Sequence, residues 1–281
     1  MKSLDQTEQK EKSSLMTSAT IIIPARWGST RFEGKPLTAE LTGADGNTQT
    51  LIWWTYKAAL KALPADRIWV ATDDDRISNA VSNFGGQSLM TDLNCRNGTE
   101  RVQQAAQLLN LSQDEIIINF QGDAPLTPPS FVGSLIEAMS KSADCKVATP
   151  ALRCDGKTFN RFKDQRKRGL VGGTTVVISS SGKALYFSKE VLPFSDKLLD
   201  GASPIPVFHH VGLYAYRRQA LDMYVGMPLG ALEQVEGLEQ LRFLENDVPI
   251  NCVEVDAEGR LFWEVNNPED VSLVSANLRA D

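Results

Sequence analysis

The sequence predicts an α/β fold in which one sheet is covered by helices. Apolar runs of strand length alternate with segments of helical periodicity from Ile21 to Val255, which is typical of βαβ units. Several of these strands run into polar loops, as strands do at the ligand-binding edge of an open α/β sheet. No internal repeat and no long Pro/Gly/Ser linker divides the chain. We therefore expect a single domain over residues 20–281, with an inserted lobe at about 150–225 and a disordered polar tail over residues 1–19.

The elements of the first half follow one another in regular order. Ile21 to Ile23 are typical of a buried strand, and further strands are expected at residues 67–72, 87–90 and 115–120. Helices are expected at residues 51–62, 76–84, 98–109 and 128–140, because apolar residues recur there at helical spacing and Gly or Pro stands near several ends.

The second half changes character, because residues 145–200 are richer in charge and Gly. A strand is expected at residues 174–178. The basic run Arg161–Arg168 is predicted to be a solvated or mobile loop, with attraction of an anionic substrate as the alternative. Strands are then expected at 211–216, 250–255 and 262–265, and a final helix from Pro268. A strong helix is predicted over residues 232–246, with an apolar side formed by Leu232, Val235, Leu238, Leu241 and Leu244.

Composition argues against several classes of protein. The formal net charge of −6 disfavours a general nucleic-acid-binding protein, which would be strongly basic. The 4 cysteines form no Cys-x-x-Cys pair and accompany 2 histidines, so neither a zinc site nor a disulfide framework is expected. No apolar run reaches the ~18 residues of a membrane helix, and residues 1–19 lack the apolar core of a secretory signal. We expect a soluble, cytoplasmic protein without membrane insertion.

A loop rich in basic residues follows the first strand. Residues 24–37 carry Arg26, Ser29, Arg31 and Lys35. Arg and Lys side chains at the carboxyl end of a strand can hold several phosphate oxygens at once. The spacing matches neither a P-loop nor a dinucleotide-binding motif, so the loop favours another kind of nucleoside triphosphate site. The alternative is an ordinary turn with solvated charges.

Two further segments are expected at the same edge of the sheet. Asp123 follows the strand at 115–120 through a Gly, and a carboxylate there is a natural ligand for Mg²⁺. Its alternative role is to cap a turn. Asn97, Thr99 and Arg101 begin the helix at 98–109, where free N–H groups could bind a base or a phosphate. The alternatives are that Thr99 is only the N-cap and Arg101 a surface charge.

Eight segments resemble, in order, those of one enzyme family. They are PARWGSTRFEGKPL at 24–37, VATDDDR at 70–76, NGTER at 97–101, QGDAPL at 121–126, ALYFSK at 184–189, HVGLYAYR at 210–217, LEQLR at 238–242 and NPED at 267–270. Over these residues the chain is similar to the 3-deoxy-manno-octulosonate (KDO) cytidylyltransferases, also called CMP-KDO synthetases. The similarity runs from about Ile21 to the C-terminus and leaves out the tail and the basic run.

The resemblance implies a nucleotide-diphospho-sugar transferase fold of the Rossmann-like, GT-A type, with a mixed sheet. It also implies a homodimer, Mg²⁺ as cofactor, and the reaction of CTP with KDO to give CMP-KDO and pyrophosphate for lipopolysaccharide biosynthesis. The inserted lobe would bind the sugar and form the dimer.

The same resemblance assigns roles to individual residues. Catalysis would depend on Arg26, Lys35 and Asp123. Nucleotide contacts would come from Arg26, Ser29, Lys35, Asn97, Thr99, Arg101 and Gln121, with Arg31 a weaker candidate. Mg²⁺ would bind Asp123 and Asn266, and the sugar acid would be held by Lys189, His210, Tyr214, Glu239 and Gln240. The separation of four residues between His210 and Tyr214 predicts that both lie on one face of a strand.

Three positions depart from the family pattern. Asn266 stands where an Asp would give the metal a second carboxylate, and an amide brings no negative charge. Ala124 replaces a Glu beside Asp123, and Lys189 replaces an Arg that could bind a carboxylate through two hydrogen bonds. These changes leave two alternatives to KDO activation. One is CMP activation of a KDO analogue or a nonulosonate, and the other is a catalytically silent nucleotide-binding paralogue.

Overall fold

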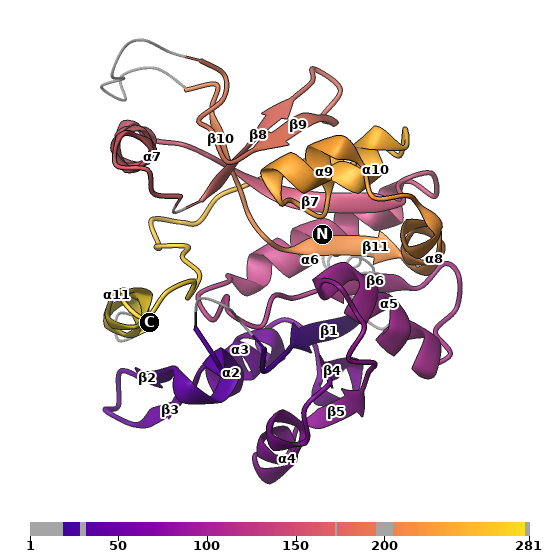
Figure 1. Ribbon diagram of the computed structural model, residues 1–281, viewed down its shortest axis with the longest axis vertical. Coiled ribbons are helices and arrows are strands. Elements are labelled where there is room, and N and C mark those ends of the chain that lie inside the picture. The colour runs from indigo at the N-terminus through magenta and orange to yellow at the C-terminus, as the bar shows by residue number, and fades with distance from the viewer. Residues whose placement is uncertain (1–18, 29–31, 172, 195–204, 279–281) are drawn as a thin grey trace, which may run out of the picture.

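A computed structural model of the chain describes residues 19–28, 32–171, 173–194 and 205–278. Within these residues ten strands form one mixed sheet in the order β5-β4-β1-β6-β11-β7-β10-β8-β9, and β12 pairs with β7 (Figure 1). The strands are β1 (Ala19–Ala25), β4 (Ile68–Thr72), β5 (Gln87–Met90), β6 (Ile116–Asn119), β7 (Val147–Arg153), β8 (Thr174–Ile178), β9 (Ala184–Ser188), β10 (Phe208–His210), β11 (Tyr214–Arg217) and β12 (Asn251–Val255).

The first half of the chain forms the parallel part of the sheet, in which β1 lies between β4 and β6 and β5 extends the edge. Ile21 and Ile23 of β1 pack on one face with α3 and α6, whereas Ile22 packs on the other face with α5 and with α8 (Arg218–Gly226). Strands buried on both faces read as continuous apolar runs, which explains the sequence of β1. The helices of this part are α3 (Leu51–Leu60), α4 (Asp75–Asn83), α5 (Gly98–Leu108) and α6 (Pro129–Lys141).

Close approach of two strand ends creates the edge where ligands could bind. The carboxyl ends of β1 and β6 meet because these strands are parallel neighbours. At Gly122 a Cβ atom would lie 2.7 Å from the backbone oxygen of Pro24. A side chain at this position would therefore force the loop after β6 away from the loop after β1.

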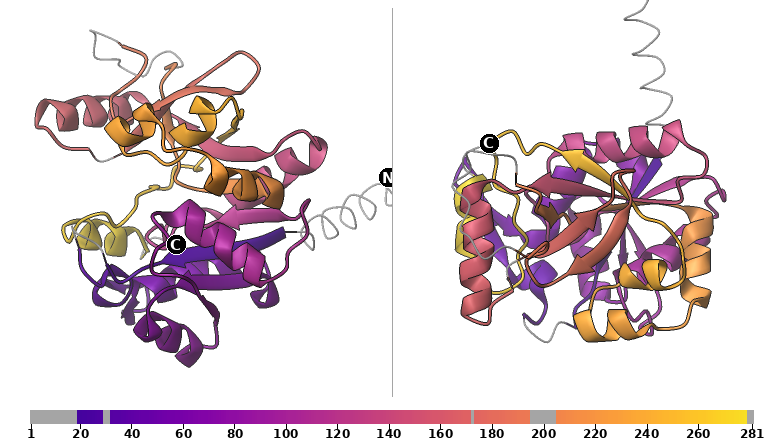
Figure 2. Two further views of the ribbon diagram at one scale, coloured as in Figure 1. Left: turned by 45° about the vertical axis from the view of Figure 1, so that its right-hand side comes forward. Right: turned by 90° about the horizontal axis from the view of Figure 1, so that it is seen from above.

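The second half of the sheet is mainly antiparallel. β11 lies between β6 and β7, and β10 lies between β7 and β8. In the left view of Figure 2 most of this half, drawn in red to orange, lies above the indigo and purple elements that include β4 and β5. Its helices are α7 (Gly156–Lys167), α8 (Arg218–Gly226), α9 (Ala231–Glu236) and α10 (Leu241–Glu245).

The C-terminal helix α11 (Asp270–Leu278) returns to the first half of the chain. It packs on a hairpin of β2 (Glu40–Thr42) and β3 (Thr48–Thr50), where Leu41, Leu51 and Val274 share a small core. Ser275 Oγ accepts a hydrogen bond from the backbone N–H of Thr42 at 3.2 Å. The segment between β12 and α11 therefore crosses from the second half of the sheet to the β2–β3 hairpin of the first half. Two short helices complete this part, α2 (Lys35–Thr38) and the 3-10 turn η1 (Ala65–Arg67).

Two of the predicted helical and loop assignments were wrong. The helix over 232–246 is broken into α9 and α10 because Gly237 adopts a left-handed conformation with φ 62°. Leu232 and Val235 consequently lie 41% and 86% exposed and do not form a buried side. The basic run is not a loop but most of helix α7, because Phe159 and Phe162 bury one side of it.

Two of the predicted strands also differ from the structure. Of the strand predicted at 211–216 only the second half is present, as the start of β11 at Tyr214; residues 211–213 lie outside any strand, after β10 ends at His210. Residues 262–265 form no strand; the backbone N–H of Val265 instead donates to the oxygen of Asp123 at 2.9 Å. β1 begins at Ala19, which the prediction placed in the tail, and the rest of that tail, residues 1–18, lies outside the described residues. Within the described part of the chain no helix has the length and apolarity needed to span a membrane.

Candidate active site

A cavity of about 310 Å³ lies at the edge of the sheet where β1 and β6 end. Its lining includes most of the residues predicted to contact a nucleotide, namely Arg26, Lys35, Asn97, Arg101 and Gln121, together with Asp123. Arg26 is exposed to solvent. Ser29 and Arg31 lie outside the described residues. The structure thus brings the basic loop, the start of α5 and the loop after β6 to one place.

Lys35 and Asp123 form an ion pair in this cavity. Lys35 Nζ donates to Asp123 Oδ2 at 2.5 Å and to the backbone oxygen of Val265 at 2.8 Å. Both side chains remain partly accessible, at 15% and 22% exposure. A triphosphate entering the cavity would compete with Asp123 for the Lys35 ammonium, because both ligands are anionic. The pair therefore couples the position of Lys35 to whatever binds at Asp123.

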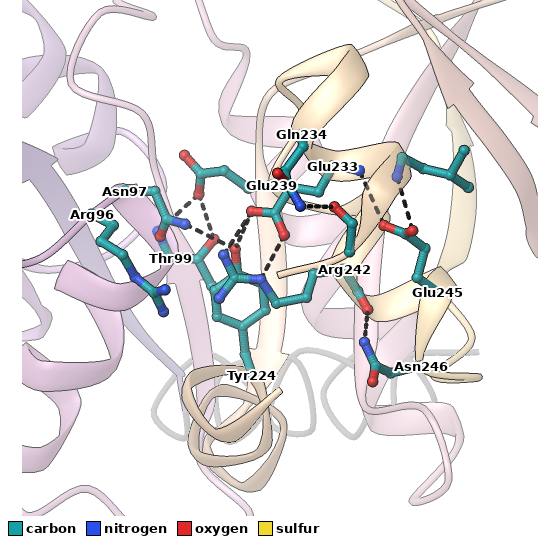
Figure 3. A network of polar contacts seen from close by, with 12 residues as sticks. Arg96, Asn97, Thr99, Tyr224, Glu233, Gln234, Glu239, Arg242, Glu245 and Asn246 are labelled. Carbon is teal, nitrogen blue, oxygen red and sulfur yellow. Dashed lines mark hydrogen bonds and ion pairs between the residues drawn. The ribbon is translucent and has the colours of Figure 1, made fainter. Parts of the chain in front are cut away.

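The start of α5 is held by carboxylate and amide groups (Figure 3). Asn97, not Thr99, is the N-cap, since its Oδ1 accepts from the N–H of Glu100 at 2.9 Å. Glu239 accepts hydrogen bonds from Gly98 N at 3.3 Å, Thr99 N at 3.1 Å and Thr99 Oγ1 at 2.8 Å. A carboxylate is stabilised at this position by the unpaired N–H groups and the positive end of the helix dipole. Glu239 thus joins the turn before α10 to α5.

Arg101 is not a surface charge. Its side chain is 3% exposed, and its guanidinium donates to Asp73 Oδ2 at 2.6 Å and to Thr91 Oγ1 at 2.5 Å. Asp73 belongs to the VATDDDR segment after β4. The charge of Arg101 is therefore balanced by Asp73 inside the protein. The Arg101 side chain forms a fixed, buried part of the cavity lining and is not a free cation.

A second cavity of about 550 Å³ adjoins the first. It is lined by every residue predicted to hold a sugar acid, namely Lys189, His210, Tyr214, Glu239 and Gln240, and also by Thr99 and Asn266. Gln121, Asp123 and Glu239 line both cavities. Asp123 accordingly stands where the two cavities meet, which is the place where a group bound in one could react with a group bound in the other.

His210 and Tyr214 are joined by a hydrogen bond, although they lie on different strands. His210 Nε2 and Tyr214 Oη are 2.8 Å apart, and His210 Nδ1 is 2.9 Å from Thr174 Oγ1. Burial, and then the nearby His209, lower the pKa of His210 to about 3. Burial raises the pKa of Tyr214 well above its ordinary value. His210 is therefore neutral at physiological pH, and both of its ring nitrogens are within hydrogen-bond distance of protein hydroxyls, so it brings no positive charge to the cavity.

Gln240 carries an unsatisfied buried group that indicates a ligand. Its side chain is 6% exposed, and Nε2 has no hydrogen-bond partner among the described residues. Leaving such a donor unpaired costs about 1–3 kcal/mol. Because Gln240 lines the second cavity, a hydroxyl or carboxylate bound there would remove this cost.

Comparison with known proteins identifies the family. The cytidylyltransferase family matches residues 20–250. The chain belongs to this family.

Individual cytidylyltransferases are similar to this chain over nearly its whole length. The 3-deoxy-manno-octulosonate cytidylyltransferase of Maricaulis maris (strain MCS10) is 44% identical over 94% of this chain and 98% of its own. The 8-amino-3,8-dideoxy-manno-octulosonate cytidylyltransferase of Shewanella pealeana (strain ATCC 700345 / ANG-SQ1) is 38% identical over 94% of this chain and 100% of its own. A solved CMP:2-keto-3-deoxy-manno-octonic acid synthetase complexed with CTP is 32% identical, covers 92% of this chain and 97% of its own, and superimposes with a TM-score of 0.75. These matches confirm the resemblance and the nucleotidyltransferase fold that the sequence motifs indicate.

This cytidylyltransferase has a further carboxylate in the second cavity that sequence reasoning missed. Glu264 lines the cavity together with Asp123 and Asn266. Burial, and then repulsion from Asp123, raise the pKa of Glu264 to about 7. Asn266 Nδ2 donates to Glu264 Oε2 at 3.4 Å. A signal was present in the sequence, because Glu264 lies two residues before Asn266, the position already noted for its missing carboxylate.

A buried network that the sequence reasoning also missed supports the start of α5 (Figure 3). Arg242 of α10 is 1% exposed and binds Glu233 through Nε at 2.6 Å and Nη2 at 2.7 Å. Its Nη1 lies 3.4 Å from Glu100 Oε1, and its guanidinium lies 4.1 Å from the centre of the Tyr224 ring. Tyr224 Oη in turn accepts from Asn97 Nδ2 at 2.9 Å. The network connects α9 and α10 to the start of α5.

The buried histidines predict a dependence of stability on pH. The folded-state pKa of His210, about 3, lies below its ordinary value of 6.5, so folding disfavours protonation. Its contribution to the free energy of unfolding is complete above pH 6.5 and is lost as the pH falls toward 3, by on the order of 1 kcal/mol per pH unit. We expect His210→Asn to flatten the fall in stability between pH 6.5 and 5.0, measured by urea unfolding. An unchanged slope would contradict burial of a neutral His210.

Proposed function

We propose that this cytidylyltransferase transfers CMP from CTP to KDO or a close analogue, releases pyrophosphate, and so supplies an activated sugar acid for lipopolysaccharide biosynthesis. The proposal is supported by the relatives named for these substrates. The observation that carries it is the position of Asp123 at the junction of two cavities, one lined by basic residues and one by hydrogen-bonding groups. Such an arrangement suits a reaction between a bound nucleotide and a bound sugar.

The chemistry assigned to these residues is an in-line displacement. The anomeric hydroxyl of the sugar attacks the α-phosphorus of CTP and releases its proton, a new P–O bond forms, and the bond to the pyrophosphate oxygen breaks so that pyrophosphate leaves. Arg26 and Lys35 hold phosphate oxygens and offset the charge that develops on them. Gln240 and Lys189 hold the sugar in the second cavity, so that its hydroxyl is aligned with the phosphate. Lys35 must release part of its interaction with Asp123 when the triphosphate arrives.

Mg²⁺ is part of the proposal, and the donor atoms near the junction suit it. Mg²⁺ prefers oxygen ligands and is commonly bound through one or two carboxylates together with substrate phosphates. The Asp123 carboxylate and the Asn266 amide line the same cavity. When bound, the ion would supply positive charge beside the α-phosphate. Removal of divalent cations with a chelator is expected to abolish turnover, and addition of Mg²⁺ to restore it.

A homodimer in the cytoplasm completes the proposal. The resemblance implies the dimer, and the exposed apolar side chains Leu232 and Val235 on α9 provide a surface that a second subunit could cover. A cytoplasmic location would give the enzyme access to free CTP. Sedimentation equilibrium of the purified protein tests the dimer, and a mass equal to one chain at micromolar concentration would exclude it.

The experiment that tests the reaction measures pyrophosphate released from CTP in the presence of Mg²⁺ and KDO. Parallel reactions contain 8-amino-3,8-dideoxy-manno-octulosonate, a sialic acid, other nucleoside triphosphates, or no sugar. We expect release that requires CTP and an octulosonate. Release with sialic acid alone would favour the nonulosonate alternative. Binding of CTP without release for any sugar would favour a catalytically silent paralogue.

A further inference from the structure

Glu264 is a carboxylate two residues before Asn266, the position where this chain lacks the Asp of the family pattern. It lines the second cavity beside Asp123 and Asn266. We propose that Glu264 supplies the second carboxylate to the divalent cation at Asp123, in place of the Asp that the family pattern has at residue 266. This inference rests on the proposed metal dependence, and it concerns which side chains of this chain provide the charge.

The backbone of residues 264–266 is fixed against Asp123. The N–H of Val265 donates to the backbone oxygen of Asp123 at 2.9 Å, and the backbone oxygen of Val265 accepts from Lys35 Nζ at 2.8 Å. Asp270 holds the other side of the segment, since its carboxylate accepts from Asn266 N at 2.9 Å and from Trp263 Nε1 at 2.9 Å. Glu264 is therefore presented from a segment whose distance from Asp123 is set by hydrogen bonds on both sides.

The surroundings of the Glu264 side chain are shaped to hold a carboxylate. A Cβ atom at Gly212 would lie 2.6 Å from Glu264 Oε1, so the absence of a side chain at Gly212 leaves the space that this oxygen occupies. Asn266 Nδ2 donates to Glu264 Oε2 at 3.4 Å. With its amide nitrogen turned toward Glu264, Asn266 has its amide oxygen available as a neutral ligand.

The balance of charge favours a cation at this place. The carboxylates of Asp123 and Glu264 line the same cavity, and Lys35 hydrogen bonds to Asp123. Two carboxylates beside one ammonium leave an excess of negative charge, which a divalent cation would neutralise. The described residues contain no cluster of three or more His, Cys, Asp or Glu side chains able to hold a metal. The ion would therefore rely on these two carboxylates, the Asn266 amide and substrate phosphates.

A set of exchange variants tests the inference through metal binding as well as turnover. The free Mn²⁺ signal in electron paramagnetic resonance is titrated at fixed CTP without sugar, with and without protein. We expect Glu264→Gln to weaken protein-dependent Mn²⁺ binding by on the order of 10-fold. Adding Asn266→Asp to Glu264→Gln should restore binding, because one carboxylate is returned to the segment. Glu269→Gln, at an exposed carboxylate outside both cavities, should leave binding unchanged.

Gly212→Ala provides a second route that keeps Glu264 itself. Its Cβ would displace the Glu264 carboxylate, so weaker Mn²⁺ binding is expected here too, and combination with Glu264→Gln should add little further loss. Unchanged Mn²⁺ affinity in both Glu264→Gln and Gly212→Ala would overturn the inference. If Glu264→Gln then lost only the use of the 8-amino sugar acid, the carboxylate would serve the sugar. Wild-type protein that bound no Mn²⁺ with CTP would instead refute the proposed metal dependence itself.

Discussion

Asp123→Asn is expected to lower kcat by roughly 10²–10³-fold, a loss typical of removing one preorganised electrostatic group from an active site. The substitution keeps the size of the side chain but removes the negative charge at the junction of the two cavities. Lys35 would lose its ionic partner at 2.5 Å, and a divalent cation would lose a carboxylate. Pyrophosphate release at saturating CTP and sugar measures the effect.

Two controls distinguish a loss of catalysis in Asp123→Asn from a loss of folding. Asp144→Asn replaces an exposed carboxylate before β7 and should leave kcat unchanged. Asp123→Asn itself should keep the urea midpoint of the wild type within a small margin, because the amide has the same size and its oxygen can still accept the hydrogen bond from Lys35 Nζ. A variant that folds normally and retains more than a tenth of wild-type turnover would exclude Asp123 from the chemistry.

The parallel half of the fold could be predicted from sequence because its strands are buried on both faces. The runs at Ile21–Ile23 and Ile116–Ile118 are apolar without interruption, as such strands require. The sequence of the antiparallel half predicts its strands and helices less clearly. β7 contains Pro150, a residue that argues against a central strand, and α7 has a polar composition that conceals the buried Phe159 and Phe162. In each case tertiary packing overrides local sequence preference.

Backbone conformation at one residue explains the broken helix. Leucines recur at helical spacing on both sides of Gly237, so periodicity alone favours a continuous helix. The left-handed conformation of Gly237 ends α9, as Gly commonly does at the C-terminus of a helix. The turn that follows carries Glu239 and Gln240 to the cavities. Treating Gly237 as a stop signal would have predicted both the break and the position of these two polar side chains in a turn rather than within a helix.

The candidate site was predictable where it depends on strand ends and short motifs. The loops at Arg26 and Asp123 meet because β1 and β6 are parallel neighbours, a property of the fold class. The hydrogen bond between His210 and Tyr214 joins two strands across a connection outside any strand, so the period of a single strand could not explain it. Glu264 is a candidate site residue only because the fold brings it to the same cavity as Asp123, which is distant in sequence. Periodicity within one helix or strand cannot predict such a pair.

Arg242→Leu is expected to lower the free energy of unfolding by about 3–5 kcal/mol, because it leaves a buried carboxylate without its partner. Glu233 is 6% exposed and receives two hydrogen bonds from Arg242. Although burial opposes it, hydrogen bonding with Glu233 raises the pKa of Arg242 above its ordinary value, so the guanidinium is charged in the folded protein. Urea unfolding at neutral pH, followed by circular dichroism, measures the loss.

Two further variants separate the buried ion pair from a general effect of removing a basic side chain. Lys141→Met breaks an exposed pair with Glu137 on α6 and should change the free energy of unfolding by less than about 0.5 kcal/mol. Adding Glu233→Gln to Arg242→Leu should recover part of the stability, because the uncompensated charge is removed while the amide can still hydrogen bond. If Arg242→Leu cost no more than Lys141→Met, the network would not be what connects α10 to the start of α5.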